Sequence, residues 1–130
     1  LKIKKFIQKG KNLGDRIINA LNISFKKFSP VVIIGSDLWK LEISDIEDAF
    51  RILKNKNIVI GPSTDGGYYL IGMNYLNTKI FENKNWGQES VLNDTIRDID
   101  DKTNIHLLDE KIDIDTYEDL CQFPDLKIKL

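Results

Sequence analysis

The stretch from Ile58 to Gly72 constrains the fold most, because it holds two apolar runs on either side of a short polar turn. The first run, residues 58–60, consists of three β-branched residues, which suit a strand that is buried on both faces. Pro62 cannot donate a backbone hydrogen bond to a sheet, so this strand should stop there. The second run, residues 68–71, predicts that the chain re-enters the sheet. The stretch therefore predicts two strands joined by a turn that exposes a carboxylate.

That carboxylate is Asp65, which directly precedes Gly66 and Gly67. Glycine lacks a Cβ atom, so it permits positive φ and lets a ligand approach the acid closely. One interpretation makes Asp65 a functional residue. The other is a hairpin-like turn with an incidental acid, whose side chain would bind the backbone amides just downstream. Both interpretations stand on the residues alone.

Composition limits the class of protein. With 130 residues, 42% of them hydrophobic, the chain can bury one core and is most simply one domain. A formal charge of −1 provides no global field for nucleic acid or an anionic membrane, so we expect neither partner. A single cysteine, Cys121, excludes an intramolecular disulfide and indicates a cytoplasmic protein. No apolar stretch approaches the roughly 20 residues that span a bilayer, and we expect a soluble protein.

A second strand is predicted at 31–34, a β-branched run that is too short for a helix. It ends at Gly35, Ser36 and Asp37. Ligands of open parallel α/β sheets bind outside the carboxyl ends of the strands, so this position favours chemistry. Asp37 is therefore the leading candidate for a metal ligand. The alternative, a helix cap or turn acid, carries equal weight at this point.

A helix should connect these two strands. Ser44 and Glu47 form a capping-box pattern ahead of a helical apolar face, which predicts a helix over about 44–54. Strand, helix and strand then form a βαβ unit with a right-handed crossover and parallel strands at 31–34 and 58–60. The same reasoning on apolar spacing predicts helices over 16–26 and 90–99 and a short strand at 105–108.

The beginning of the chain carries weaker signals. Residues 1–7 alternate apolar and basic side chains, as in a strand or the end of a longer element, and residues 8–15 have the composition of a loop. Asp15 is placed to lie in the first turn of the helix that follows. Trp86 is expected to anchor the loop before the helix at 90–99.

A second acidic group lies at 112–120. A helix capped by Asp115 or Thr116 would explain most of these acids through the helix dipole. That interpretation leaves Asp113 unexplained and does not exclude Asp115 from binding a metal. His106, the sole histidine, is better explained as a surface or hydrogen-bonded side chain and receives no role.

Taken together, the Gly35–Asp37 triplet, the Gly61–Gly72 element, Trp86 and the acids of 113–120 resemble the radical-SAM/selenodomain-associated transferase family. This bacterial group of glycosyltransferase-like proteins is similar to molybdenum-cofactor guanylyltransferase and phospholactate guanylyltransferase. The resemblance covers essentially the whole chain. It implies an α/β fold of the Rossmann-like GT-A nucleotide-diphospho-sugar transferase type, with a partly parallel sheet and flanking helices.

The resemblance also implies a site. Asp37 corresponds to the strand-end acid that holds a divalent metal, and Asp115 resembles the second ligand. Gln8 to Arg16 resembles the family's Gln-x-Gly-x-x-Leu-Gly-x-Arg segment near the nucleotide pocket. The predicted site comprises catalytic Asp65, metal ligands Asp37 and Asp115, and nucleotide- or substrate-binding Gln8, Gly14, Arg16, Gly35, Ser36, Gly66 and Gly67.

Two departures from the family pattern bear on activity. Trp39 stands where the family usually has proline. The family also begins with another βαβ stretch bearing a Lys/Arg-rich phosphate loop, which this sequence lacks. We therefore expect the chain to be a single domain over 1–130 that corresponds to the carboxy-terminal two-thirds of the fold, and to be inactive in isolation.

The expected function is a metal-dependent transfer from a nucleoside triphosphate or nucleotide sugar to a small-molecule acceptor. Mg²⁺ or Mn²⁺ on Asp37 and Asp115 would bridge the phosphates, because carboxylate oxygens suit hard cations. Asp65 would orient the acceptor or act as its base. The sequence does not separate nucleotidyl from glycosyl transfer, and a homodimer is compatible with both. The alternative is a non-catalytic nucleotide-binding or regulatory domain, which the missing phosphate loop favours.

Overall fold

A computed structural model describes residues 3–36, 40–112 and 121 of the chain. Its elements are α1 (Leu13–Phe25), β1 (Val31–Ile34), α2 (Ile43–Ile52), β2 (Ile58–Pro62), β3 (Tyr68–Met73), the 3₁₀ turn η1 (Lys79–Phe81), α3 (Val91–Arg97), the 3₁₀ turn η2 (Lys102–Asn104) and β4 (Ile105–Leu107). This arrangement confirms the predicted α/β class. Among the described residues, no helix has both the length and the apolar character needed to cross a membrane.

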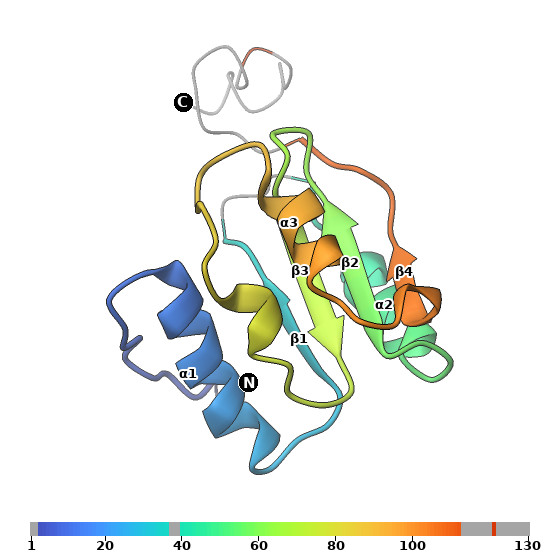
Figure 1. Cartoon of the computed structure of the whole chain (residues 1–130). Coiled ribbons are helices and arrows are strands. Elements are labelled where there is room, and N and C mark those ends of the chain that lie inside the picture. Colours follow the sequence, from blue (N-terminus) through green and yellow to red (C-terminus); the bar gives the residue numbers. More distant parts are fainter. Residues whose placement is uncertain (1–2, 37–39, 113–120, 122–130) are drawn as a thin grey trace.

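The sheet has the strand order β1-β3-β2-β4 (Figure 1). β3 is antiparallel to both β1 and β2, so these two strands run in the same direction with one strand between them. β4 is parallel to β2. The prediction that β1 and β2 are parallel near-neighbours is confirmed. β3 lies between them because the tight turn at 63–67 brings the chain directly back beside β2.

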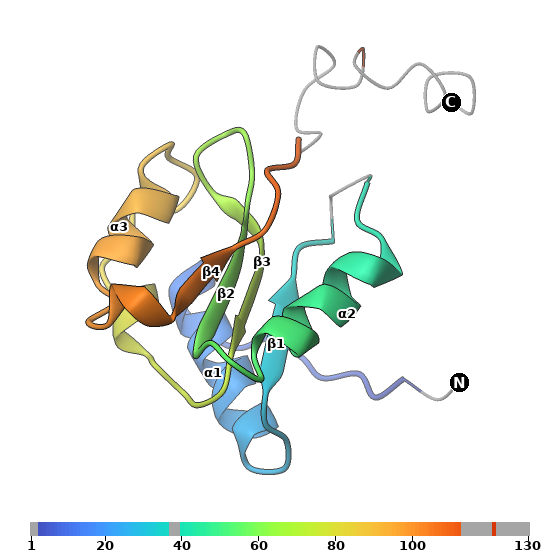
Figure 2. The same ribbon diagram turned by 90° about the vertical axis from the view of Figure 1, so that its right-hand side faces the viewer.

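Helices cover both faces of the sheet: α1 and α3 lie on one face and α2 on the other (Figure 2). Each face has its own core. The residues of the larger core are Leu21, Ile58, Ile60, Ile71, Met73, Ile80, Phe81 and Ile99, and those of the smaller core are Ala49, Leu53, Val59, Tyr69 and Leu70. β2 contributes to both cores because successive side chains of a strand point to opposite faces. Its continuous apolar sequence is thereby explained.

The helix starts were predicted less accurately than the helices themselves. α1 begins at Leu13, where the Asn12 side chain accepts a hydrogen bond from the Asp15 backbone at 2.9 Å, and Asp15 lies in the first turn as predicted. α2 begins at Ile43, one residue before the predicted Ser44.

The predicted capping box of α2 was wrong in its residues. The reciprocal pair is Glu42 and Asp45, and the Asp45 carboxylate accepts from the Glu42 backbone at 2.8 Å. Ser44 and Glu47 match the usual Ser/Thr-x-x-Glu pattern, whereas Glu42 and Asp45 make the same reciprocal bonds with two acidic side chains. The helix uses the pair that lies two residues upstream of the predicted one.

The amino-terminal segment does not form the strand that was one of its two interpretations. Residues 3–9 have no regular structure, and Ile3, Phe6 and Ile7 are exposed. The alternating pattern therefore does not form a strand over these described residues. The predicted helices at 16–26 and 90–99 and the strand at 105–108 are confirmed as α1, α3 and β4.

Candidate functional site

A cleft of about 600 Å³ lies where β1 and β2 end. The two strands run in the same direction, so their carboxyl ends meet at one edge of the sheet. The lining residues are Gln8, Leu13, Ile17, Ile33, Ile34, Gly35, Ser36, Ser63, Asp65, Gly67, Tyr68, Tyr69, Leu70, Ile71, Trp86, Gly87, Gln88 and Val91. Five of the predicted site residues thus share one cleft: Gln8, Gly35, Ser36, Asp65 and Gly67.

The turn at 63–67 forms one side of the cleft. Asp65 Oδ1 accepts hydrogen bonds from Ser63 Oγ at 2.6 Å and from the Gly67 backbone at 3.0 Å. The Ser63 backbone donates in turn to the Gly67 carbonyl at 3.0 Å. This is the turn geometry that the structural interpretation of Asp65 expects. The same side chain also lines the cleft, so the contacts fix its position without removing it from the site.

The two glycines of the turn are constrained by different surroundings. Gly66 has φ +89°, and a Cβ there would collide with the Glu89 carbonyl oxygen. Its own carbonyl accepts from the Leu92 backbone at 2.9 Å, so Gly66 joins the turn to the start of α3. A Cβ on Gly67 would lie 3.3 Å from Asp65 Oδ1 and 3.5 Å from Ser63 Oγ. Gly67 lines the cleft, whereas Gly66 serves packing.

The first turn of α1 and the loop before it form the opposite side. Gly14 is buried, and a Cβ on it would collide with the Phe81 carbonyl oxygen and lie 3.1 Å from Trp86 Nε1. Arg16 is exposed, and its Nε donates to the Gly10 carbonyl at 3.4 Å. Neither Gly14 nor Arg16 is among the residues that line the cleft. Of the predicted residues in this segment, only Gln8 reaches it.

Two aromatic side chains contribute to the cleft walls. Trp86 is half-buried and packs against the larger core, which confirms its anchoring role. Burial raises the pKa of Tyr68 to about 12, and the neighbouring Thr95 hydroxyl partly offsets this rise in the pKa. The two buried hydroxyl groups face each other, although neither has a partner in good hydrogen-bonding geometry among the described residues. Tyr68 is thus a protonated, largely buried side chain at neutral pH.

A polar cluster lies next to Tyr69. Lys111 Nζ is 3.1 Å from Asp45 Oδ2 and 5.9 Å from the centre of the Tyr69 ring. Tyr69 donates its hydroxyl to the Asp109 carbonyl at 2.9 Å. Burial, followed by the Asp45 and Asp109 carboxylates, raises the pKa of Tyr69 to about 12. No local sequence pattern predicts this cluster, because its ion pair joins residues that are far apart in the chain.

Lys111 also connects three segments at this edge of the sheet. Its backbone N–H donates to the Pro62 carbonyl at 3.0 Å, and its carbonyl accepts from the Thr64 backbone at 2.9 Å. Its Nζ donates to the Lys40 carbonyl at 3.1 Å. The start of α2 and the turn at 63–67 are therefore held to the segment that follows β4.

The predicted metal ligands, Asp37 and Asp115, lie outside the described residues. Gly35 and Ser36, directly before Asp37, line the cleft, and the Gly35 backbone donates to the Tyr69 carbonyl at 2.9 Å. Within residues 3–36, 40–112 and 121, no group of three or more His, Cys, Asp or Glu side chains could hold a metal ion. The convergence of Asp37 and Asp115 remains a prediction.

Sequence reasoning missed the apolar part of the cleft. Leu13 was placed in the predicted loop over 8–15, Ile17 in the predicted helix and Ile33 in the predicted strand, yet all three line the cleft. Leu13 is 48% exposed and Ile34 is 43% exposed. Periodicity shows that such residues face inward, but it does not show whether another element covers them.

Comparison with known proteins places the chain among transferase-like folds. Residues 2–88 match the family described as "Uncharacterized protein conserved in bacteria (DUF2064)". The fold also matches a crystal structure of a "putative nucleotide-diphospho-sugar transferase" from Desulfovibrio desulfuricans G20, with a TM-score of 0.81 and 31% sequence identity. The match covers 87% of this chain and 51% of that one, so the chain spans about half the length of that protein. No protein of curated function matches the chain significantly.

Proposed function

Because the chain belongs to the DUF2064 family and shares its fold with the Desulfovibrio protein, we propose that it is part of a metal-dependent transferase acting on a nucleotide or nucleotide sugar. Within that family we assign it to the radical-SAM/selenodomain-associated transferases. The observation that carries the proposal is the cleft at the carboxyl ends of β1 and β2. Ligands of open α/β sheets bind at such edges, and small-molecule sites have volumes of roughly 300–1,000 Å³.

The donor would be a nucleoside triphosphate or a nucleotide sugar, and the acceptor a small molecule. Gln8, Ser36 and Gly67 supply polar groups to the cleft from three separate segments. Convergence of segments that are distant in sequence is what a site for a small polar molecule requires. Arg16 is exposed and lies outside the lining, and its guanidinium group is of the kind that binds donor phosphates.

Asp65 is proposed to position the acceptor hydroxyl. Its carboxylate accepts hydrogen bonds from Ser63 Oγ and the Gly67 backbone, which hold it in one orientation beside the cleft. A carboxylate held in this way can accept a hydrogen bond from a hydroxyl group and aim its oxygen at the donor. Positioning of this kind supplies a large part of catalysis in group transfer.

Asp37 and Asp115 are proposed to hold Mg²⁺ or Mn²⁺, for which carboxylate oxygens are suitable donors. When bound, such an ion would neutralise negative charge on the donor phosphates. The described residues provide no metal site of their own, so the ligands would have to come from these two acids or their neighbours.

The test measures transfer by the native protein that contains this chain. Nucleoside triphosphates and nucleotide sugars are supplied with Mg²⁺ or Mn²⁺, and release of pyrophosphate or nucleoside diphosphate is followed. Asp37→Asn and Asp115→Asn should each lower turnover by about tenfold or more. Asp100→Asn is the matched control, because the Asp100 side chain is 90% exposed and pairs only with Lys79 among the described residues.

Three results distinguish the outcomes. Ion-dependent turnover that falls in the two variants and not in the control supports the proposal. Tight nucleotide binding without turnover of any donor would instead identify a non-catalytic nucleotide-binding domain. Absence of both binding and turnover would contradict the proposed function.

A further inference from the structure

One residue outside the turn that carries Asp65 holds this turn from the side. The Lys111 backbone N–H donates to the Pro62 carbonyl at 3.0 Å, and the Lys111 carbonyl accepts from the Thr64 backbone at 2.9 Å. Lys111 therefore bonds to the chain on both sides of Ser63, with which it forms a parallel bridge. Ser63 in turn donates its hydroxyl to Asp65 Oδ1 at 2.6 Å. A displacement of Lys111 would thus reach Asp65 through a short series of hydrogen bonds.

The position of Lys111 is not set by β4, because that strand ends before it. The segment bonds to β2 through the Leu108 backbone, which donates to the Ile60 carbonyl at 2.8 Å. Beyond that point, Tyr69 donates its hydroxyl to the Asp109 carbonyl at 2.9 Å, and the Lys111 side chain reaches the start of α2. The place of the Lys111 backbone, and through it that of the turn, therefore depends on these side-chain contacts.

The Lys111 side chain ends among well-fixed partners. Its Nζ lies 3.1 Å from Asp45 Oδ2, donates to the Lys40 carbonyl at 3.1 Å and lies 5.9 Å from the centre of the Tyr69 ring. The same Asp45 oxygen accepts from the Glu42 backbone at 2.8 Å, so the cap of α2 fixes the anion that Lys111 meets. The two charged side chains are only 19% and 20% exposed, and ion pairs at exposed sites contribute much less than hydrogen-bonded pairs shielded from water.

Lys111 is linked in this way to two parts of the cleft, although it does not line the cleft itself. Asp65, in the turn, is a lining residue, and the far side of the turn is held by the Gly66 carbonyl, which accepts from the start of α3 at 2.9 Å. Tyr69, beside the Lys111 side chain, also lines the cleft, and its carbonyl accepts from the Gly35 backbone at the end of β1 at 2.9 Å. Lys111 therefore connects the turn to the neighbouring strand end.

We propose, on the basis of the proposed function, that Lys111 is a positioning residue for the transfer reaction. It acts through the turn at 63–67, which it holds at the distance from β1 at which the Asp65 carboxylate meets the acceptor hydroxyl. Asp45 is the fixed partner against which Lys111 is held. Group transfer depends on such alignment, because a displacement of about 1 Å can lower the rate by about 100-fold.

Amide hydrogen exchange in the full chain tests the structural part of the proposal without any substrate. Lys111→Met keeps most of the aliphatic length of the side chain and removes its charge. The Thr64 and Gly67 amides, which bond to the Lys111 carbonyl and to Asp65 Oδ1, should exchange about tenfold faster in this variant. Amides of α1 should keep their exchange rates, since only a general loss of stability would accelerate them too. Lys111→Arg retains the charge and should keep the turn amides close to the wild-type rates.

Two acids on α2 provide a matched control. Asp45→Asn keeps an acceptor oxygen for the Glu42 backbone but removes the charge that Lys111 meets. Asp48→Asn removes an exposed partner of Arg51 on the same helix. Asp45→Asn should reproduce the effect of Lys111→Met on the turn, and the double variant should show little further effect, because both changes break one interaction. Asp48→Asn should leave exchange in the turn unchanged.

Binding and turnover test the functional part of the proposal. The probe of the cleft is 2-phenylethanol, a small alcohol with an apolar ring, and Lys111→Met should weaken its binding by about threefold in an NMR titration. In the native protein that contains this chain, Lys111→Met should lower kcat by about tenfold and leave the KM of the nucleotide donor unchanged. Lys111→Arg should recover most of this turnover. A residue that only stabilised the fold would change neither kcat nor probe binding well below the melting temperature.

Unchanged exchange of the Thr64 and Gly67 amides in Lys111→Met, or equal effects of Asp45→Asn and Asp48→Asn, would overturn the inference. Faster exchange with unchanged kcat in an active native protein would also overturn it, because Lys111 would then support the structure alone. Faster exchange together with weaker probe binding, in a native protein that transfers nothing, would support the positioning role at the cleft and contradict the proposed function. The two hypotheses can therefore fail separately.

Discussion

The two sides of the cleft are built differently. The turn wall, residues 63–67, is held by hydrogen bonds among its own polar groups, with Ser63 only 1% exposed. The apolar wall, formed by α1 and β1, leaves Leu13 and Ile34 more than 40% exposed. In the turn wall the polar groups form hydrogen bonds with one another, whereas the apolar wall leaves hydrophobic surface uncovered. The comparison indicates that the turn wall maintains the shape of the cleft and the apolar wall provides surface for a ligand.

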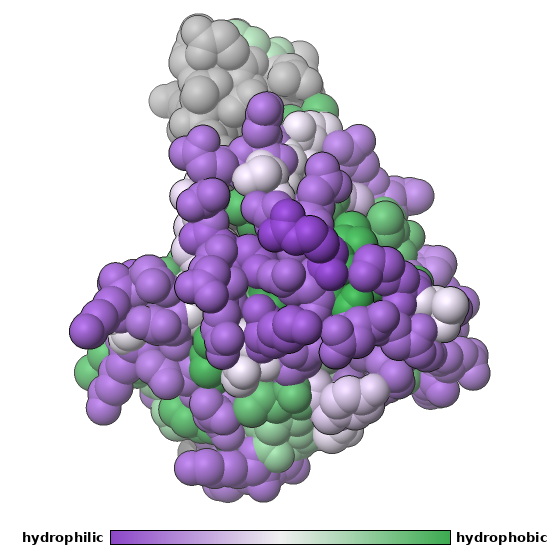
Figure 3. Space-filling view, viewed as in Figure 1, coloured by the Kyte–Doolittle hydropathy of each residue, from purple (hydrophilic) through white to green (hydrophobic). Residues whose placement is uncertain are grey.

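One face of the molecule shows the ordinary distribution of surface side chains. The face of the molecule seen in Figure 1 is mainly hydrophilic, with separate apolar patches (Figure 3). Isolated apolar residues on a surface are ordinary, whereas apolar residues gathered in a concave site indicate a ligand.

The largest effect is expected from Gly66. Gly66→Ala should lower the free energy of unfolding by about 3 kcal/mol, because alanine is strained at φ +89° and its Cβ would collide with the Glu89 backbone. Gly67→Ala should change it by less than about 1 kcal/mol, since its Cβ meets only two side-chain oxygens beyond 3 Å. Urea denaturation of both variants measures the difference. Equal destabilisation would show that the turn wall is not fixed through Gly66.

A smaller effect on stability is expected at Asp65. Asp65→Ala removes the acceptor for Ser63 Oγ and the Gly67 backbone and should lower the free energy of unfolding by about 1–2 kcal/mol. Asp65→Asn keeps an acceptor oxygen and should retain most of that stability. If Asp65 also acts on the acceptor, Asp65→Asn should still lower turnover of the native protein strongly. Normal turnover in that variant would leave Asp65 with a structural role alone.

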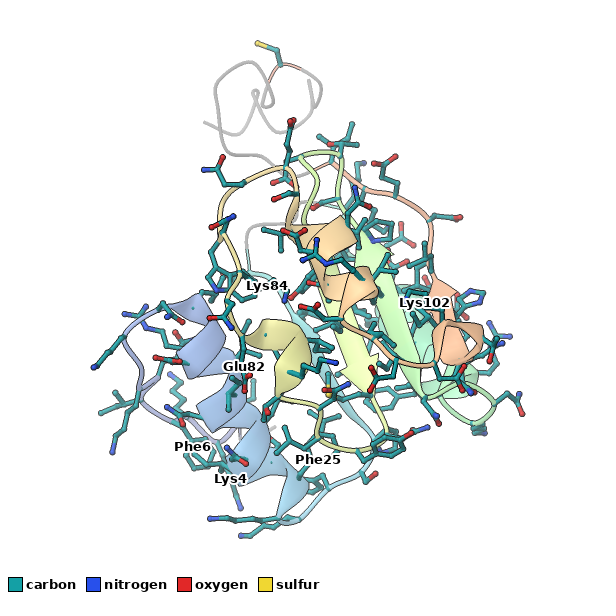
Figure 4. The ribbon with its side chains drawn as sticks, viewed as in Figure 1. Lys4, Phe6, Phe25, Glu82, Lys84 and Lys102 are labelled. Atoms are coloured by element: carbon teal, nitrogen blue, oxygen red, sulfur yellow. The ribbon has the colours of Figure 1, made fainter. Side chains whose placement is uncertain are left out.

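A third prediction concerns the segment that carries Trp86. Lys84, whose side chain is 1% exposed, lies beside α3 and pairs with Asp98 at 2.5 Å (Figure 4). The hydrogen bond from Lys84 lowers the pKa of Asp98 below its ordinary value of 3.8. A carboxyl group with a lower pKa in the folded state stabilises the fold at pH values above its unfolded-state pKa. This contribution to stability is lost as the pH falls through the folded-state pKa.

Asp98→Asn should therefore reduce the loss of stability on acidification. Melting temperatures of wild type and variant are compared from pH 7 down to pH 3, with Asp100→Asn as an exposed control. The wild type should lose more stability than Asp98→Asn over the acidic part of this range. Parallel curves would show that the ion pair does not hold the segment in place.

The sequence predicted the strands more reliably than the site. β-branched runs identified β1 and β2, and the glycine-rich turn identified the return into β3, because these signals are local. The position of β3 between β1 and β2 followed only from the structure. The cap of α2 was misassigned because the pair Glu42 and Asp45 competes with Ser44 and Glu47 within six residues of chain.

Part of the site was also predicted, because that part depends on local signals. Gly35 and Ser36 directly follow β1, and Asp65 lies in the turn after β2, so the sheet brings them to one edge. The apolar wall depends on which hydrophobic residues stay uncovered, and the pair of Lys111 with Asp45 depends on contacts between distant segments. Neither property is encoded in a local pattern.

The most direct test of the central claim is an NMR titration of the full chain with 2-phenylethanol. Trp39 and Trp86 give two indole N–H signals, which Trp86→Phe assigns. If the cleft is the ligand site, the Trp86 indole and Leu13 methyl signals should shift in proportion to occupancy, while the Ile23 methyl signals stay fixed. Shifts at Ile23 without shifts at Trp86 and Leu13, or no saturable shift at any of them, would contradict the account.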